Sequence, residues 1–203
     1  MGVSILIKNT FECTVHDQIC DKEGNYLILD ITIQECRITF VALYGPNNDS
    51  PNFFSDIRKL IENKQNSSII MVGDWNVVQD YDLDTCNYKS KNNVKAQQTL
   101  IEIKESLDLV DIWRAFNPDK KRYTWRGPDL KQSRLDYFLI STDFESIVKN
   151  TDIDVVIVQI IHLYPLLYNF ITNKKGGGHG NLTTVYCMTK IMSLKLKNAL
   201  QTL

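Results

Sequence analysis

The sequence predicts an α/β fold, and three observations support this prediction. The run Ile69-Ile70-Met71-Val72 is apolar at every position, which is typical of a strand buried on both faces. Short apolar segments separated by turn residues over 3–43 indicate an antiparallel meander. Two segments, 51–64 and 94–107, repeat apolar residues at helical spacing. A chain of 203 residues is long enough for one sizeable core, or at most two small ones.

Composition limits the classes of function. Hydrophobic residues make up 43% and charged residues 23% of the chain, which is ordinary for a globular domain. The net charge of −1 gives no general attraction to nucleic acid, so such binding needs a local basic patch. The five cysteines form no CxxC pair, which disfavours zinc and a disulfide framework and favours a reducing compartment. We expect no membrane segment and no secretion, which leaves a nuclear or cytoplasmic location.

The first half of the chain is expected to be rich in strands. The expected strands span residues 3–7, 13–20, 26–33 and 37–43. Tyr44 ends the last of them, where it either offers its hydroxyl to a site or is an aromatic side chain at the rim. The helix over 51–64 follows, with Ser50 as its expected N-cap.

The central buried strand ends at Gly73, and Asp74 and Asn76 follow. A glycine at the carboxyl end of a strand lets the backbone turn sharply, so the next polar side chains lie at the mouth of the sheet. Asp74 offers an anionic oxygen, and Asn76 offers a donor and an acceptor for a phosphate oxygen or a water. The alternative is a strand-to-loop turn that Asp and Asn merely cap.

Two charged segments allow more than one interpretation. The acidic run 80–84 suggests calcium, but its spacing lacks the turn glycine and the closing glutamate of an EF-hand loop. The basic run 120–126 is interleaved with aromatic residues, a combination that suits a phosphate backbone and exposed bases. That run is alternatively a solvated strand with two aromatic residues in the core.

A strand is expected over 133–140, with Asp136 in its middle. A carboxylate inside an apolar strand needs a partner, because burying it unpaired is costly. The partner is either Arg134, two residues away, or a histidine from elsewhere. A last strand is expected over 154–158, and His162 follows in an apolar run as a core histidine or a catalyst.

Four motifs occur in a characteristic order: Leu43-Tyr44-Gly45-Pro46-Asn47, Gly73-Asp74-Trp75-Asn76, Tyr123-Thr124-Trp125 and Ser133-Arg134-Leu135-Asp136-Tyr137. Together they resemble the endonuclease domain of non-LTR (LINE-type) retrotransposons, which belongs to the endonuclease/exonuclease/phosphatase superfamily. Residues 83–89 and the pair 92–93 resemble the LINE branch in particular. The likeness runs from about residue 2 to residue 170.

The resemblance implies a four-layered α/β sandwich of the DNase I-like type and magnesium-dependent nicking of DNA, in a domain associated with reverse transcriptase. It implies that Asp74 positions or deprotonates the attacking water, that Asn76 holds the scissile phosphate and that Tyr44 contacts a phosphate oxygen. Asp136 would orient a histidine, matched by position to His162, and this pair would stabilise charge on the phosphate.

The resemblance also implies a DNA-binding surface beside this site. Thr124 would line the DNA groove. Arg122 and Arg126, from the basic run, are the accompanying candidates for substrate binding. DNA is therefore the expected partner, and magnesium is the expected cofactor.

The chain departs from the family pattern near both ends. The family's first strands carry an Asn and the Glu that is its main magnesium ligand, and no match precedes Met1. We therefore expect residues 1–170 to form a partial domain, incomplete at its N-terminus, and the metal ligand here is unknown. Residues 171–203 are expected to be a degenerate tail, because codons for the segment after Gly178 can be chosen that give a family-like sequence in a shifted frame.

Two hypotheses about function follow from these motifs and departures. The first is a Mg-dependent DNA endonuclease domain of a retrotransposon, weak or inactive in this copy because the metal-binding Glu is missing. The alternative is a non-catalytic remnant with at most residual DNA or protein binding. A phosphatase acting on small phosphate esters is disfavoured by residues 83–85 and by the absence of phosphatase-like insertions.

Overall fold

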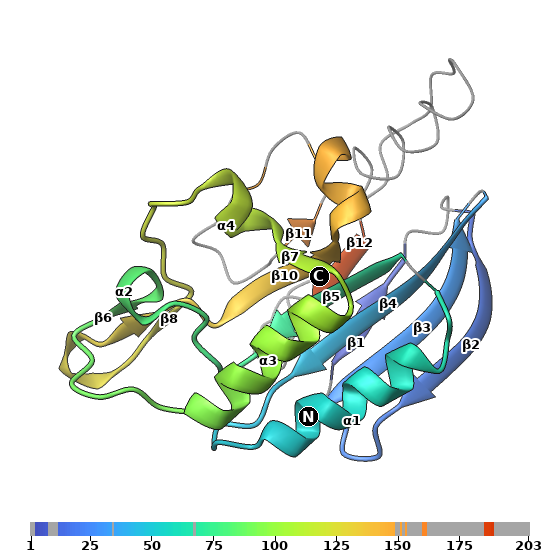
Figure 1. The fold of residues 1–203 in the computed structure, drawn as a ribbon. Helices are drawn as coiled ribbons and strands as arrows, with labels where there is room; N and C mark the ends of the chain where they lie inside the picture. The colour runs from blue at the N-terminus through green and yellow to red at the C-terminus, as the bar shows by residue number, and fades with distance from the viewer. Residues whose placement is uncertain are drawn as a thin grey trace, which may run out of the picture.

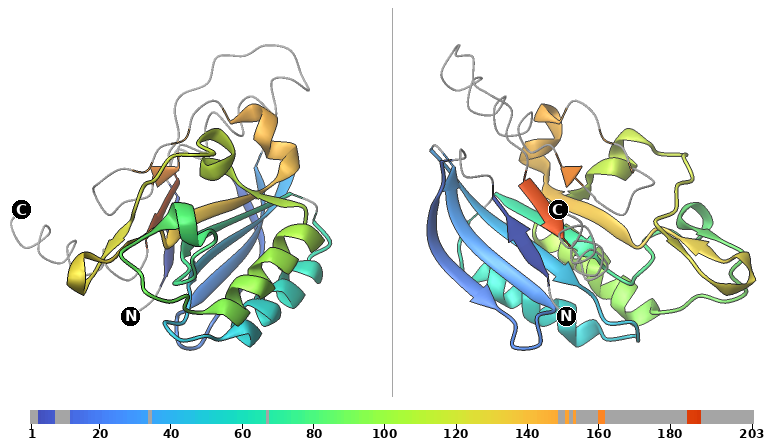
Figure 2. Two further views of the ribbon diagram at one scale, coloured as in Figure 1. Left: turned by 60° about the vertical axis from the view of Figure 1, so that its left-hand side comes forward. Right: turned by 180° about the vertical axis from the view of Figure 1, so that it is seen from behind.

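Six strands form the main sheet of the protein, and two helices cover one of its faces (Figure 1). A computed structural model describes residues 3–7, 12–33, 35–66, 68–148, 151, 153, 160–161 and 185–188. A small three-stranded sheet packs on the opposite face, as the view from behind shows (Figure 2). The described residues thus form three successive layers, of helices, main sheet and small sheet, and the predicted α/β class is confirmed.

The main sheet has the order β2-β3-β4-β5-β10-β7. Its strands are β2 (Thr14–Cys20), β3 (Tyr26–Ile33), β4 (Cys36–Tyr44), β5 (Ile69–Asp74), β10 (Asp136–Ser141) and β7 (Leu109–Asp111). All neighbours are antiparallel except β4 and β5, which are parallel. The predicted antiparallel meander is therefore confirmed for β2-β3-β4, but the strand expected over 3–7 belongs to a different sheet and is no part of the meander.

Strand β5 is buried along its whole length, as its sequence predicts. Ile70 and Val72 pack into the apolar cluster between the two sheets, whereas Ile69 and Met71 pack under the helices. Gly73 is required because a Cβ at this position would lie 1.8 Å from the backbone oxygen of Leu43 on β4. The strand that carries Asp74 is thus fixed on both faces.

The two long helices are α1 (Pro51–Glu62) and α3 (Val94–Ser106), close to their predicted ranges. Their apolar stripes, which include Phe54, Ile57 and Leu100, lie in the cluster over the main sheet. Ser50 occupies the N-cap position of α1, but its side chain makes no capping hydrogen bond. Shorter helical segments are α2 (Tyr81–Asp84), α4 (Ile112–Phe116), η1 (Pro128–Leu130) and η2 (Thr142–Ile147). Within the described ranges, no helix is both long and apolar enough to cross a membrane.

Two small sheets flank the main one. The first joins β1 (Ser4–Leu6), β12 (Val185–Met188) and β11 (Ile160–Ile161). Strand β12, in the segment expected to be a degenerate tail, pairs antiparallel with β1. The second sheet, which we call the arm, joins β6 (Thr85–Cys86), β9 (Gln132–Ser133) and β8 (Trp125–Arg126) and projects from one end of the molecule (Figure 1).

The structure corrects two predictions from the second half of the chain. The strand expected over 133–140 is broken, and Asp136 begins β10 instead of lying in the middle of a strand. In the basic run, only Trp125–Arg126 form a strand, and Trp125 is 37% exposed, so the interpretation with two core aromatics is wrong. The predicted strand over 154–158 and His162 lie outside the described residues.

Candidate active site

Three neighbouring strands bring three predicted site residues into one row. Tyr44 ends β4, Asp74 ends β5 and Asp136 begins β10. In the sheet register, Tyr44 and Asp136 are the partners of Asp74 on its two sides. Residues opposite each other on adjacent strands share a face. Because Val72, two residues earlier on β5, packs between the sheets, the row lies on the face that carries the small sheet.

Asn76 connects the turns that leave β4 and β5. Its backbone adopts a left-handed conformation with φ of 52°, which Asn tolerates better than most residues. Its side-chain Nδ2 donates to the Gly45 carbonyl at 2.8 Å, and its backbone N–H donates to Asp74 Oδ1 at 3.1 Å. Gly45 donates its own N–H to the Asp74 carbonyl at 2.7 Å. The two turns therefore hold Asp74 from both sides.

The two carboxyl groups have abnormal proton affinities. Burial, followed by repulsion from Asp136, raises the pKa of Asp74 to about 7, although the Asn76 amide lowers it. Burial also raises the pKa of Asp136, while a hydrogen bond from Thr124 lowers it. Two adjacent carboxyl groups with raised pKa values bind a proton or a cation readily. Such raised pKa values are typical of catalytic sites.

Thr124 supports Asp136 directly. Its Oγ1 accepts the backbone N–H groups of Leu135 at 3.0 Å and Asp136 at 3.1 Å. Its own N–H donates to the Ser133 carbonyl at 3.0 Å. Thr124 therefore bridges the arm and the start of β10, and its predicted place along a DNA groove stays a prediction.

The two arginines of the basic run lie in different surroundings. Arg122 donates from Nε and Nη2 to the Ile153 carbonyl, at 3.2 and 3.1 Å. Arg126 lies on β8 of the arm and is exposed. The exposed apolar side chain of Trp125 lies on the same strand, and Leu130, which is 78% exposed, lies in η1 between two strands of the arm. His162 lies outside the described residues, so its predicted pairing with Asp136 stays a prediction.

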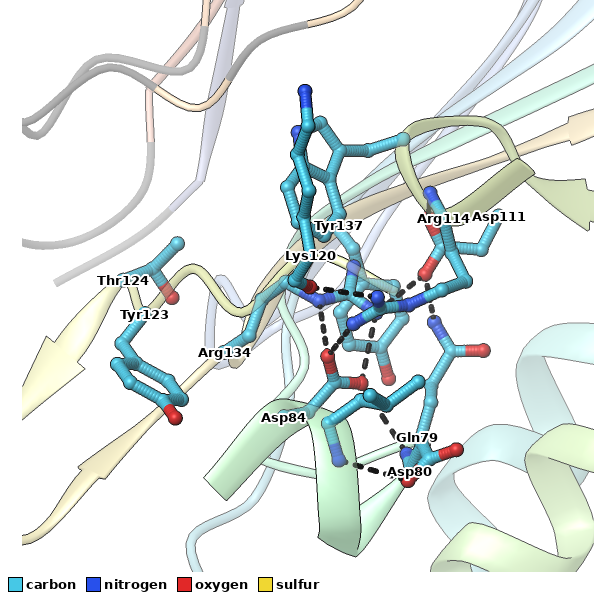
Figure 3. Close-up of polar contacts among 12 residues, drawn as sticks. Gln79, Asp80, Asp84, Asp111, Arg114, Lys120, Tyr123, Thr124, Arg134 and Tyr137 are labelled. Carbon is cyan, nitrogen blue, oxygen red and sulfur yellow. Dashed lines mark hydrogen bonds and ion pairs between the residues drawn. The ribbon is translucent and has the colours of Figure 1, made fainter. Parts of the chain in front are cut away.

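A buried ion-pair network is centred on Arg134, and it excludes this arginine as the partner of Asp136 (Figure 3). Arg134 binds both carboxylate oxygens of Asp84, at 2.8 and 2.9 Å, and a carboxylate oxygen of Asp111 at 2.7 Å. Arg114 forms a second ion pair with Asp84. The interpretation that paired Arg134 with Asp136 from their spacing is therefore wrong.

The same network explains the acidic run 80–84. Asp84 is fully buried between the two arginines. Asp80 caps α2, accepting the N–H groups of Asp82 at 2.9 Å and Leu83 at 3.0 Å. The sequence alone did not identify Asp84 and Asp111 as ion-pair partners of Arg134. They precede Arg134 by 50 and 23 residues, too far apart for a local pattern to show the pairing. The only sequence signal was an Arg next to an apolar strand, which needs a counter-charge when buried.

Comparison with solved structures identifies the fold. An AP endonuclease from Leishmania major superimposes with a TM-score of 0.59, covering 92% of this chain and 70% of that one, at 16% identity. The chain adopts the DNase I-like endonuclease/exonuclease/phosphatase fold. The 3′ phosphatase NExo from Neisseria, bound to a product DNA hairpin, gives 0.55, covering 91% of this chain and 79% of that one at 15% identity.

The predicted resemblance to retrotransposon endonucleases is confirmed by two further similarities. The endonuclease domain of TRAS1, a telomere-specific non-LTR retrotransposon, superimposes with a TM-score of 0.52 at 13% identity, covering 93% of this chain and 79% of that chain. In sequence, the chain is 25% identical over 159 residues to the "Transposon TX1 uncharacterized 149 kDa protein" of Xenopus laevis. That match covers 75% of this chain, which spans only 12% of the Xenopus protein. Profiles of known protein families give no match.

Proposed function

We propose that this chain is a metal-dependent DNA endonuclease domain of a non-LTR retrotransposon. The observation that carries the proposal is the row of Tyr44, Asp74 and Asp136 across three adjacent strands, with Asn76 fixed beside it. The solved proteins with this fold include enzymes named as endonucleases and one bound to product DNA, which supports DNA as the substrate.

The row supplies the groups that hydrolysis of a phosphodiester needs. Asp74, with a pKa near 7, can orient the attacking water and accept its proton as the oxygen attacks phosphorus and the bond to the leaving oxygen breaks. Asn76 has one amide hydrogen on Gly45 and a second hydrogen available for a phosphate oxygen. The Tyr44 hydroxyl is proposed to contact another phosphate oxygen.

The carboxyl pair also fits the magnesium that the family resemblance implies. Asp74 and Asp136 are hard oxygen donors, and Mg²⁺ is commonly held by one or two carboxylates together with waters and substrate phosphates. Burial raises the pKa of both carboxyls, and among the described residues no cation appears among the causes that lower either value. These two residues would hold the ion, which would stabilise the charge that develops on the phosphate.

A plasmid-nicking assay with Mg²⁺ tests the proposal. The wild-type chain should relax supercoiled plasmid in Mg²⁺ but not in EDTA, and Asp74→Asn should reduce the rate by roughly 100-fold or more. Asp56→Asn is the matched control, because the Asp56 side chain is exposed on α1 and pairs only with Lys59 in the described contacts. DNA binding without nicking by the wild type would favour the non-catalytic remnant instead.

A further inference from the structure

Asn93 lies at the start of α3 and touches both turns that shape the site. It is buried, and it occupies the N-cap position without making a capping hydrogen bond. Its Nδ2 donates instead to the Asn76 carbonyl at 2.8 Å and to the Asn47 carbonyl at 3.3 Å. Both amide hydrogens are therefore directed at backbone oxygens of the two turns.

The backbone conformations explain why asparagine suits both ends of this contact. Asn93 and Asn76 each have φ of 52°, in the left-handed region that asparagine enters more readily than other residues with a side chain. A left-handed backbone conformation at a residue with a side chain is unfavourable by itself, and contacts with surrounding residues have to stabilise it. The bond from Asn93 to the Asn76 carbonyl is one such restraint, and the bond from Asn76 Nδ2 to Gly45 is another.

A second contact anchors α3 to the same turn. Asp49 accepts the backbone N–H groups of Lys95 at 3.1 Å and Ala96 at 2.8 Å, in the first turn of α3. The start of α3 is therefore tied to the loop between β4 and α1, which contains Asn47. Asn93 extends from this anchored point to Asn76, whose N–H donates to Asp74.

From these contacts we infer that Asn93 is a positioning residue, which acts through Asn76 on the Asp74 carboxylate. This role rests on the proposed endonuclease function. The Asn76 N–H donates to Asp74 Oδ1 at 3.1 Å, so the position of the Asn76 turn sets the position of that carboxylate. Removing the side chain of Asn93 frees the Asn76 turn and weakens the hydrogen bond from the Asn76 N–H to Asp74. The Asp74 carboxylate, the proposed base, is then misplaced.

Asn93→Gly is the test variant, because glycine adopts the left-handed conformation without strain and only the side-chain donors are lost. Asn66→Gly is the matched control. The Asn66 side chain also donates two hydrogen bonds, to Asp30 and Thr39 at 3.0 Å each, but near the opposite end of β5. Asn93→Asp is a second variant that keeps the size of the side chain and replaces its donors with an anion.

The readouts are the backbone amide resonance of Asn76, the backbone amide resonance of Asp74, and the kinetics of nicking. Asn93→Gly and Asn93→Asp should shift both resonances and lower kcat roughly tenfold with KM nearly unchanged. Asn66→Gly should leave all three at their wild-type values. Resonances of Asn76 and Asp74 that stay unchanged in both Asn93 variants would overturn the inference. If the wild type does not nick DNA, the proposed function fails, and the two resonances still decide the role of Asn93.

Discussion

Asp74 is the residue at which stability and function oppose each other most directly. Asp74 is only 8% exposed and lies opposite Asp136 across the strand pair. Burial and repulsion raise its pKa to about 7, so ionisation near neutral pH lowers the free energy of unfolding. The backbone N–H of Asn76 and the turn at Gly45 hold this destabilising carboxyl in place, as its proposed active-site role requires.

The first prediction concerns the pH dependence of this conflict. The pKa of Asp74 is higher in the folded protein than its usual value. Protonation of Asp74 therefore contributes its full share to the free energy of unfolding below about pH 4, and this contribution is lost as the pH rises through 7. Asp74→Asn should therefore stabilise the metal-free protein by about 2 to 4 kcal/mol at pH 8, and by much less at pH 5. Thermal melts of both proteins at the two pH values measure this difference. Equal gains at both values would contradict it, and Asp56→Asn serves as the exposed control.

A second residue-scale prediction concerns Thr124. Replacement by valine keeps the shape of the side chain but removes the acceptor for two backbone N–H groups and the hydrogen bond to the Asp136 carboxyl. Thr124→Val should lower the free energy of unfolding by about 1 to 3 kcal/mol and raise the pKa of Asp136. Urea denaturation and a carboxyl titration check both effects. Thr124→Ser, which keeps the hydroxyl, should retain most of the wild-type behaviour, and a loss as large as that of valine would refute this account.

At the scale of elements, the Arg134 network joins parts of the chain that are distant in the sequence. Asp84 ends α2, Asp111 ends β7 and Arg114 lies in α4, and all three charges converge on or beside Arg134. The rings of Trp113 and Tyr137 both lie 5.3 Å from the Arg134 guanidinium carbon. The network therefore fixes the base of the arm and the residues that lead into β10.

The third prediction tests this network. Arg134→Met leaves Asp111 without its arginine and Asp84 with only Arg114, so the free energy of unfolding should fall by about 3 to 5 kcal/mol. Adding Asp84→Asn and Asp111→Asn to Arg134→Met should recover part of the loss, because neutral amides cost less to bury than unpaired charges. Chemical denaturation of the three proteins measures both steps. Lys59→Met, at an exposed ion pair, should change stability by less than about 1 kcal/mol.

The elements that sequence reasoning placed well are those with a strong local pattern. Strand β5 and helices α1 and α3 each have an apolar pattern in the sequence that matches their buried faces. Asp74 was placed well because it follows Gly73, a glycine that the close contact with the neighbouring strand requires. The break before Asp136 was missed because its cause is not local. Arg134 forms ion pairs with Asp84 and Asp111, which are distant in the sequence. These ion pairs determine the backbone conformation before Asp136 more strongly than strand propensity does.

For the whole molecule, the site lies at one end of the strands, on the face that the small sheet covers, and the arm extends beside it (Figure 1). A net charge of −1 means that DNA cannot be drawn to the molecule as a whole. Attraction has to come from a local surface, and the arm and the segment leading to it carry Lys120, Lys121, Arg126 and Lys131. The layered body thus supplies rigidity, and we propose that the arm supplies contacts to the DNA phosphates.

The last prediction tests the arm as the DNA-binding surface through the salt dependence of affinity. Each phosphate contact releases counterions, so the logarithm of the binding constant falls against the logarithm of salt concentration by about 0.9 per contact on duplex DNA. Arg126→Gln should weaken binding similarly for all sequences and reduce that slope by about 1. Lys59→Gln removes the same charge from α1, in the helical layer, and should leave both affinity and slope nearly unchanged. Fluorescence anisotropy with a labelled duplex at several salt concentrations measures the slopes. Equal slopes for wild type and Arg126→Gln would mean that the DNA phosphates contact another face of the fold, and the charge on the arm would then have no part in binding.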